Sequence, residues 1–345
     1  MCNIAGYIGD KPAVPILIDM MRAQEGLDGG CYTGIATIHE GKIHYRKLVG
    51  DLERLLAETD AESLPGTIGI IHTRTPGDTG DSWAHPFVCE REGEIKTAFV
   101  LNGCEGNFKA VKQKGSEIAE RLLAKGFDLK SRIPSNGKSV TLSDNTRVHP
   151  TDIICQLIGE KMEEGYDIPD AMAEAYCELP KEVVGLMLSL AEPDTIAWSR
   201  MNFPMHIGFA DHGAYLATAP QAFPRDAGEP HLLPVLSSGL IYKDSFTCRP
   251  FKKKPGTVAE LNSHTRQITY DAICQALREE KQTVPTLGKL IWNMFDPADC
   301  TQRGAAIYAA LYDLDRQGKL KMEKGYKPGV REGLQAPVYY MWIED

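Results

Sequence analysis

A cysteine at position 2 stands directly before an apolar segment, and this placement limits how the chain can begin its fold. The chain opens Met1-Cys2-Asn3-Ile4, and we predict that residues 3–9 form a buried strand. Removal of Met1, which the small side chain of Cys2 permits, gives a first residue that carries both a thiol and a free α-amine. An α-amine titrates near neutral pH and can serve as the base for a thiol nucleophile. The alternative interpretation is that Cys2 is a small apolar residue entering a strand.

Composition excludes several classes of protein. The 345 residues, 43% of them hydrophobic and 25% charged, predict a large core and two domains. A net charge of −9 argues against a general binder of nucleic acids or membrane surfaces. No apolar run is long enough to span a bilayer, and the start does not resemble a signal peptide. The nine cysteines and nine histidines are scattered, so we expect a cytoplasmic protein with reduced thiols, no metal site and no cofactor.

Strand patterns occur at both ends of the main part of the chain, with helical patterns between them. We predict an α+β fold in which sheets pack face to face with helices outside. Residues 129–148 are polar and predict a mobile loop. The tail has a different pattern, with three predicted helices followed by two strands, which is typical of a winged helix. These expected elements are helices at 268–280, 286–295 and 301–317, strands at 320–323 and 338–343, and a loop at 325–333.

An N-terminal cysteine that attacks an amide needs donors for the oxyanion that forms. Asn102 and Gly103 follow an apolar strand at 97–101 and can supply a side-chain amide and a backbone N–H. An amino-acid substrate also needs a cation for its carboxylate, such as Arg74, and an acceptor for its ammonium group, such as Asp152 or a backbone carbonyl. Each signal is weak by itself, since Asn-Gly is a common turn and a lone arginine after a strand usually forms a surface ion pair.

Taken together and in order, these stretches resemble the class II glutamine amidotransferases, which are N-terminal-nucleophile (Ntn) hydrolases. The resemblance is greatest to the glutaminase domain of glucosamine-6-phosphate synthases. The start M-C-N-I-A-G-Y-I-G is similar to M-C-G-I-V-G-Y-I-G. The matching later stretches are residues 29–36, G-I-I-H-T-R at 69–74, A-H-P at 84–86, L-N-G at 101–103 and A-T-A-P at 217–220.

The resemblance implies a fold and a set of roles. The fold is an αββα sandwich over residues 2–255, followed by a winged-helix-like domain over 267–345. Cys2 is implied as the nucleophile, its α-amine as the base, and Asn102 with Gly103 as the oxyanion hole. The implied substrate-binding residues are Gly29, Arg74, Thr75, Asp78, His85 and Asp152.

Departures from the family pattern concentrate in the substrate-recognition residues. Asn3 stands where a glycine is usual, and Thr75–Asp78 replaces the usual Trp-Ala-Thr-His. Pro150 takes the place of the aspartate that binds the glutamine ammonium group in the family. We therefore expect weak or altered glutamine affinity. We expect no sugar-isomerase domain and no phosphate-cradling glycine loop.

Three functions stay open at this point. The first is a glutaminase that releases ammonia from L-glutamine through a γ-glutamyl thioester, for a synthase on a separate chain. The second is an Ntn amidohydrolase of another amide, and the third is a metabolite-sensing regulator with a winged-helix output module. Residues 285–345 hold eight Lys and Arg and eight Asp and Glu, so we expect the tail to bind protein, in a homo-oligomer or with a partner, and not DNA. We also expect deletion of the tail to have little effect on Cys2.

Overall fold

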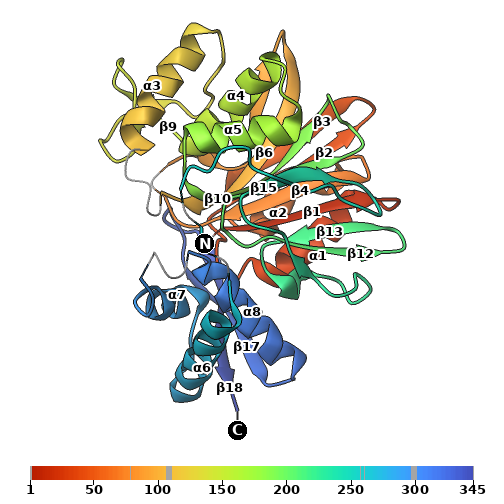
Figure 1. The fold of residues 1–345 in the computed structure, drawn as a ribbon, viewed down its shortest axis with the longest axis vertical. Helices are drawn as coiled ribbons and strands as arrows, with labels where there is room; N and C mark the ends of the chain where they lie inside the picture. Colours follow the sequence, from red (N-terminus) through yellow and green to blue (C-terminus); the bar gives the residue numbers. More distant parts are fainter. Residues whose placement is uncertain are drawn as a thin grey trace.

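Two antiparallel sheets packed face to face form the body of the computed structural model (Figure 1). The structure describes residues 2–77, 79–105, 111–256, 258–259, 261–296 and 301–344. The first sheet has the order β14 (His231–Leu232), β12 (His206–Ala210), β13 (Gly213–Ala217), β1 (Asn3–Gly9), β4 (Ile68–Arg74), β2 (Tyr32–His39), β3 (Lys42–Val49). The second has the order β16 (Arg249–Pro250), β15 (Ser237–Ile241), β11 (Ile196–Arg200), β10 (Glu182–Ser189), β6 (Glu94–Cys104), β5 (Phe87–Arg91).

Alternation along β1 shows why this strand lies between two apolar layers. Ile4 and Ile8 belong to the cluster between the two sheets, where they meet Leu186 and Trp198 of the second sheet. Tyr7, which points to the opposite face, belongs to the cluster under the outer helices. Successive side chains of a strand point to opposite faces, so a strand that is apolar at nearly every position is buried on both sides.

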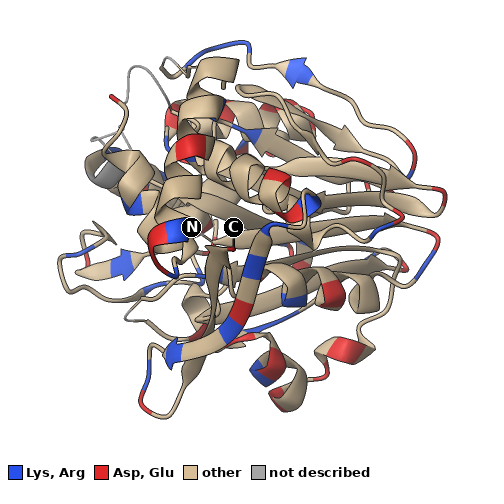
Figure 2. Cartoon of the chain, turned by 90° about the horizontal axis from the view of Figure 1, so that it is seen from below, with Lys and Arg blue, Asp and Glu red and all other residues tan. Residues whose placement is uncertain are grey.

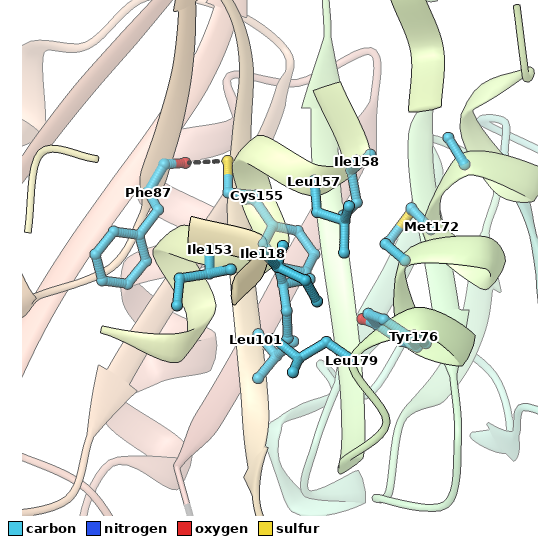
Figure 3. Close-up of a cluster of buried hydrophobic side chains, with 14 of the residues drawn as sticks. Phe87, Leu101, Ile118, Ile153, Cys155, Leu157, Ile158, Met172, Tyr176 and Leu179 are labelled. Carbon is cyan, nitrogen blue, oxygen red and sulfur yellow. Dashed lines mark hydrogen bonds between the residues drawn. The ribbon is translucent and has the colours of Figure 1, made fainter. Parts of the chain in front are cut away.

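Helices cover the outer face of each sheet. On the first sheet these are α1 (Ala13–Gln24) and α2 (Leu52–Glu58). On the second they are α3 (Val111–Ala124), α4 (Pro150–Glu163) and α5 (Ile168–Glu178). Figure 3 shows side chains of α4 and α5, among them Leu157 and Met172, in one cluster with Leu101 of β6. The predicted sequence of layers, helices outside two sheets, is therefore present.

A C-terminal lobe below the sandwich contains three helices and a two-stranded ribbon (Figure 1). Its elements are α6 (Ser263–Glu279), α7 (Val284–Trp292), α8 (Arg303–Arg316), β17 (Leu320–Pro328) and β18 (Gln335–Ile343). This is the succession that the sequence predicted, but the strands are longer. They pair from Leu320↔Ile343 to Pro328↔Gln335, so the first four residues of the predicted loop at 325–333 are strand.

Other sequence-based boundaries also change. The predicted mobile loop at 129–148 contains a small sheet of β7 (Ile133–Pro134), β9 (Thr146–Val148) and β8 (Val140–Thr141). The structure also contains α2, α5, β5 and β10, which the sequence pattern did not single out. Short 3-10 turns lie at Ala61–Ser63, Asp81–Trp83 and Pro220–Ala222. Among the helices of the described ranges, none has the length and apolar character needed to cross a bilayer.

Glu25 at the end of α1 is a buried carboxyl that joins several elements of the first sheet's outer side. Its Oε1 accepts hydrogen bonds from the backbone N–H of Leu52 at 2.8 Å and from the hydroxyls of Thr33 at 3.3 Å and Thr73 at 3.4 Å. Burial is the main cause that raises the pKa of Glu25 to about 7, and the nearby Asp51 adds to it. The folded protein therefore holds a proton at Glu25 that the unfolded chain releases at lower pH.

This difference predicts that stability falls as the pH rises from about 5 to about 7, because the folded state binds more protons there than the unfolded state. A pKa of about 7 against the ordinary 4.5 corresponds to on the order of 3 kcal/mol. Glu25→Gln keeps this position neutral at every pH. We expect the variant to be more stable than the wild type at pH 8, by up to that amount, and similar to it at pH 5, in urea unfolding.

The matched control is Glu53→Gln. Glu53 lies on exposed surface in an ion pair with Arg22, which lowers the pKa of its carboxyl. Its contribution is therefore present at neutral pH and lost toward acid, the opposite trend. A Glu25→Gln protein whose stability changes with pH as the wild type's does would contradict the assignment.

Candidate active site

One edge of the sandwich gathers the ends of four strands near Cys2. Strand β1 begins there at Asn3, which pairs with Thr73 near the end of β4. Strand β2 begins there too, since Tyr32 pairs with Arg74. Because these strands are antiparallel, the start of one lies beside the end of the next. Strand β6 reaches the same edge from the second sheet.

Cys2 and Asn102 contact one another through two hydrogen bonds. The backbone N–H of Cys2, which becomes the α-amine when Met1 is removed, donates to Oδ1 of Asn102 at 3.1 Å. The Nδ2 of Asn102 donates to the carbonyl oxygen of Cys2. The thiol sulfur lies 4.0 Å from the hydroxyl oxygen of Thr75. The side chain of Asn102 thus fixes the backbone of the cysteine from the opposite sheet.

Asn102 and Gly103 lie inside strand β6 and not in a turn. They pair with Val184 and Val183 of β10, and Asn102 is completely buried. A Cβ atom at Gly103 would lie 2.1 Å from the carbonyl oxygen of Glu182. Only glycine fits this close to the Glu182 carbonyl.

Arg74 ends β4 and extends along aromatic rings. Its guanidinium carbon lies 4.6 Å from the ring centre of Tyr32 and 5.9 Å from that of Trp83. Its Nη1 is buried and has no hydrogen-bond partner among the described residues. A guanidinium held in this way can bind a carboxylate with no rearrangement of the rings.

The Asp28–Gly30 turn passes beside Thr73. Gly29 has a φ of +96°, and a Cβ there would lie 2.6 Å from Cγ2 of Thr73. Both the conformation and the contact require glycine. The N–H of Gly30 donates to the Thr73 hydroxyl at 2.7 Å, so the turn is attached to the same end of β4 as Arg74.

Three buried histidines lie together at the site, and two of them, His85 and His149, line its cavity. The rings of His72 and His85 are stacked with centroids 3.8 Å apart, and His149 lies 5.5 Å from His85. Burial lowers the pKa of all three, to about 3 for His72 and well below the ordinary value for His85 and His149. They are therefore neutral at physiological pH and add no charge to the site.

A cavity of about 270 Å³ opens beside Cys2. Five of the residues implied by the resemblance line it, namely Cys2, Arg74, Thr75, His85 and Gly103. Asn102 and Gly29 lie just behind them, through the contacts described above. The structure thus brings seven of the nine implied residues to one place.

Two implied residues are not brought to the cavity. The carboxylate of Asp152 is buried in α4, where its Oδ2 accepts from the N–H and the hydroxyl of Ser131 at 2.8 and 2.7 Å and its Oδ1 from Gln156 at 3.2 Å. It does not line the cavity, because these bonds direct it into the protein. Asp78 lies outside the described residues. At the start of α4 the cavity is lined by Pro150 and Thr151 instead.

Sequence reasoning missed three cations of this cavity, Lys138, Arg147 and Lys181. Lys138 and Arg147 come from the polar segment that was predicted to be a loop. Lys181 follows α5 and is only 6% exposed. The polarity of residues 129–148 was a signal that this segment faces solvent, but nothing in it pointed to the cavity.

The C-terminal lobe reaches the residue next to Cys2. The amide of Asn3 donates to the carbonyl oxygens of Gln24 at 2.7 Å and Asp28 at 2.8 Å, and its Oδ1 accepts from the hydroxyl of Tyr308 in α8 at 3.0 Å. Tyr339 of β18 also donates its N–H to the carbonyl of Gly26 at 2.6 Å. The lobe therefore packs against the turn that carries Gly29, which argues against the expectation that its removal leaves Cys2 unaffected.

Metal binding finds no support within the described ranges, where no group of three or more His, Cys, Asp or Glu side chains is arranged to hold an ion. The cysteines described there are free.

No protein-family model matches the sequence. Among curated proteins the chain is similar to a glutamine–fructose-6-phosphate aminotransferase [isomerizing] of Pyrococcus horikoshii, with 27% identity over 347 residues. That match covers 93% of this chain and 53% of the relative. A protein of the same name from Zymomonas mobilis is 29% identical over 222 residues, which cover 63% of this chain and 32% of the relative. The chain thus spans about half or less of the length of these relatives.

Solved structures with this fold include a glutamine phosphoribosylpyrophosphate amidotransferase from B. subtilis, at a TM-score of 0.58 and 14% identity, covering 93% of this chain and 66% of that one. A second, described as the allosteric regulatory enzyme of purine biosynthesis, has a TM-score of 0.57. The proteins found by both comparisons are enzymes. By sequence the chain is therefore a relative of the glutamine–fructose-6-phosphate aminotransferases, and it has the fold of the class II glutamine amidotransferases, as the resemblance predicted.

Proposed function

We propose that the chain is an N-terminal-nucleophile amidohydrolase that releases ammonia from the carboxamide of L-glutamine or of a closely related compound. The observation that carries this proposal is the pair of hydrogen bonds between Cys2 and Asn102 at the cavity. It puts a thiol, the nitrogen of the future α-amine and a side-chain amide donor beside one opening. These are the three groups that acyl transfer by an N-terminal cysteine requires.

In the proposed reaction, the sulfur of Cys2 attacks the amide carbon while its α-amine takes the thiol proton. The Nδ2 of Asn102 has two N–H bonds, of which the carbonyl of Cys2 uses one. The second N–H and the backbone N–H of Gly103 stabilise the oxyanion. The C–N bond then breaks, the protonated α-amine gives its proton to the departing ammonia, and water hydrolyses the thioester to a carboxylate.

The same proposal includes the context of the activity. The sandwich is an Ntn-hydrolase αββα domain over residues 2–255, and the protein works in the cytoplasm. In this proposal ammonia passes to an acceptor on a separate synthase subunit. A cofactor is not part of the proposed mechanism.

The C-terminal lobe, in this proposal a winged-helix-like domain at residues 267–345, supports the site and binds protein, not DNA. Figure 2 shows Lys and Arg interspersed with Asp and Glu along its elements. The hydrogen bond from Tyr308 of the lobe to Asn3 stabilises the start of β1, whether or not a partner protein is bound to the lobe.

The first test is the oxyanion role of Asn102. We expect Asn102→Ala to lower kcat for amide hydrolysis by ~100-fold or more with a smaller change in KM, because one transition-state donor is lost. Alkylation of Cys2 by iodoacetamide needs the same thiol but forms no oxyanion. Its rate therefore reports the reactivity of Cys2 without the contribution of the oxyanion donors. Ammonia release and the rate of alkylation are measured on the same preparations.

Equal losses in both rates would show that Asn102 only positions Cys2. Cys2→Ala is the control for the nucleophile, and we expect it to remove ammonia release while leaving thermal unfolding nearly unchanged. Hydrolysis that persists in Cys2→Ala would overturn the proposal as a whole.

The second test concerns the link between the lobe and the site. Tyr308→Phe removes the hydroxyl that donates to Asn3 and leaves a buried acceptor unpaired, which costs on the order of 1–3 kcal/mol. We expect lower stability in urea unfolding together with slower alkylation of Cys2. Tyr312→Phe on the same helix is the control, because its hydroxyl accepts an exposed and long contact from Arg316, at 3.4 Å. A Tyr308→Phe protein with unchanged alkylation would show that the contact stabilises the lobe alone.

A further inference from the structure

A second cavity, the interlobe cavity, has a volume of about 300 Å³ and lies where the C-terminal lobe meets the sandwich. Phe203, which follows β11, lines it from the sandwich, and Val284 and Trp292 of α7 and Ile307 of α8 line it from the lobe. No residue in the described ranges lines both this cavity and the one beside Cys2. An apolar hollow with a few polar groups is the usual form of a site for a small organic molecule.

A glycine in the middle of α7 keeps the interlobe cavity open. Gly288 lines the cavity at the centre of the helix Val284–Trp292. A Cβ atom at Gly288 would meet no atom within 4 Å, and the backbone there has no positive φ. Glycine inside a helix is less favourable than alanine. Neither packing nor backbone geometry therefore requires this glycine, whereas a larger side chain would occupy room in the cavity.

Two buried polar atoms in the cavity wall have no hydrogen-bond partner among the described residues. The Nδ2 of Asn202 donates to the carbonyl of Thr301 at 3.0 Å, but its Oδ1 accepts no hydrogen bond there. The guanidinium of Arg303 stacks on Trp292, with its carbon 4.1 Å from the ring centre, and its Nη2 donates to the carbonyl of Phe295 at 2.8 Å. Its Nε has no partner in the same ranges. Since buried polar groups are normally paired, the wall offers a ligand one acceptor and one donor.

The charged side chains of the cavity wall balance one another. Asp28 and Glu182 line the cavity from the sandwich, and Lys289 and Arg303 line it from the lobe. Both carboxylates already have interactions within the protein. Among the lining residues that the structure describes, neither sign is in excess, so the wall favours a neutral ligand over an ion.

We propose that the interlobe cavity binds a neutral ring compound that carries an amide group, either as a carboxamide on the ring or as a lactam within it. The ring packs against the apolar side chains of both walls. The N–H of the amide donates to Oδ1 of Asn202, and its carbonyl oxygen accepts from Nε of Arg303. Binding here involves no covalent step, so the inference goes beyond the proposed reaction at Cys2 and does not depend on it.

The same cavity touches segments that hold the candidate active site. Ile307 lines it, and the next residue, Tyr308, donates its hydroxyl to Asn3 at 3.0 Å. Asp28 lines it too, and the carbonyl of Asp28 accepts from the amide of Asn3 at 2.8 Å. A ligand that contacts both walls holds α8 against the sandwich and thereby strengthens the contacts of Asn3. Binding in the interlobe cavity therefore increases the reactivity of Cys2.

Calorimetric titration of the full-length protein with three probes tests the ligand chemistry. Benzamide has the carboxamide, 2-pyridone has the lactam, and N,N-dimethylbenzamide has the ring and the carbonyl but no N–H. We expect a dissociation constant of about 1 mM or lower for at least one of the first two, in keeping with their small size. We expect N,N-dimethylbenzamide to bind at least tenfold more weakly than benzamide, because it leaves Oδ1 of Asn202 unpaired.

The affinities of the three probes decide between the outcomes. A preference for benzamide or for 2-pyridone identifies which form of amide the cavity takes, and supports the inference. Absence of binding by both, or binding of N,N-dimethylbenzamide as tight as that of benzamide, would overturn it.

Two substitutions of Gly288 locate the site. We expect Gly288→Leu to fill the cavity and weaken binding of the probe at least tenfold. Gly288→Ala adds one methyl group, and we expect it to retain binding and to raise the thermal unfolding temperature. Trp292→Ala removes an aromatic wall at a residue that is 46% exposed, so it is expected to fold and to weaken binding as well. Unchanged affinity in both Gly288→Leu and Trp292→Ala would place the probe elsewhere and overturn the inference.

Alkylation of Cys2 by iodoacetamide, followed by peptide mass spectrometry, measures the link to the active site. We expect a saturating concentration of the tighter-binding probe to raise this rate at least twofold in the wild type and to leave it unchanged in Gly288→Leu. Binding of the probe without a change in rate would overturn the link to Cys2 and leave the site itself intact. Neither readout requires amide hydrolysis, so failure of the proposed function and failure of this inference are distinguishable.

Discussion

The side chain of Asn3 is the point at which three parts of the molecule meet. Its amide group bonds to the end of α1, to the turn before Gly29 and to Tyr308 of α8. Its backbone belongs to β1, directly after the cysteine. A hydrogen bond between groups that are buried from water is costly to break, because the partners left behind have no solvent to replace it. The position of Cys2 therefore depends on the C-terminal lobe as well as on the sheet, and the lobe and the sandwich behave as one unit at this point.

This contact gives a physical reason for the asparagine that stands where the resemblance expects a glycine. Glycine would leave the carbonyls of Gln24 and Asp28 without these donors and the Tyr308 hydroxyl without its acceptor. Gln24 adds two further buried hydrogen bonds, since its Nε2 donates to the carbonyl of Ile4 at 3.0 Å and its Oε1 accepts from the N–H of Ala219 at 3.3 Å. An Asn at this position and a lobe that supplies a buried tyrosine are thus complementary parts of one arrangement.

Much of this fold could be predicted from the sequence because its strands are marked by local pattern. The apolar run 3–9 and the later strands occur where period and turn residues place them, and motif order indicated the family. The meaning of Asn102-Gly103 could not be derived locally, since the pair has strong turn propensity. Pairing with Val184 and Val183 makes it strand, so tertiary structure overrides the local preference.

The cavity was predicted only in part, for a different reason. Cys2, Arg74 and Gly103 lie near strand ends of the sandwich, so topology brings them together. Lys138, Arg147 and Lys181 reach the cavity from segments that are far apart in sequence and have no pattern in common. Asp152 fits the expected spacing, but the N–H and hydroxyl of Ser131 hold its carboxylate in the protein interior. The position of a carboxylate along a helix does not show which buried hydrogen-bond donor lies beside it in the folded protein.

The cations that line the cavity beside Cys2 affect chemistry and recognition in opposite ways. Positive charge beside Cys2 favours an oxyanion, so a cavity of this kind would favour attack on an amide that enters. An anionic group of a bound substrate would neutralise part of that charge, and so reduce the field at the reacting carbon. The catalytic donors must then act at short range, through the hydrogen bonds of Asn102 and Gly103, because hydrogen bonds to a developing charge persist when the longer-range field is cancelled. In the proposed mechanism, this division assigns recognition to the lysines and arginines of the cavity and transition-state stabilisation to Asn102 and Gly103 of β6.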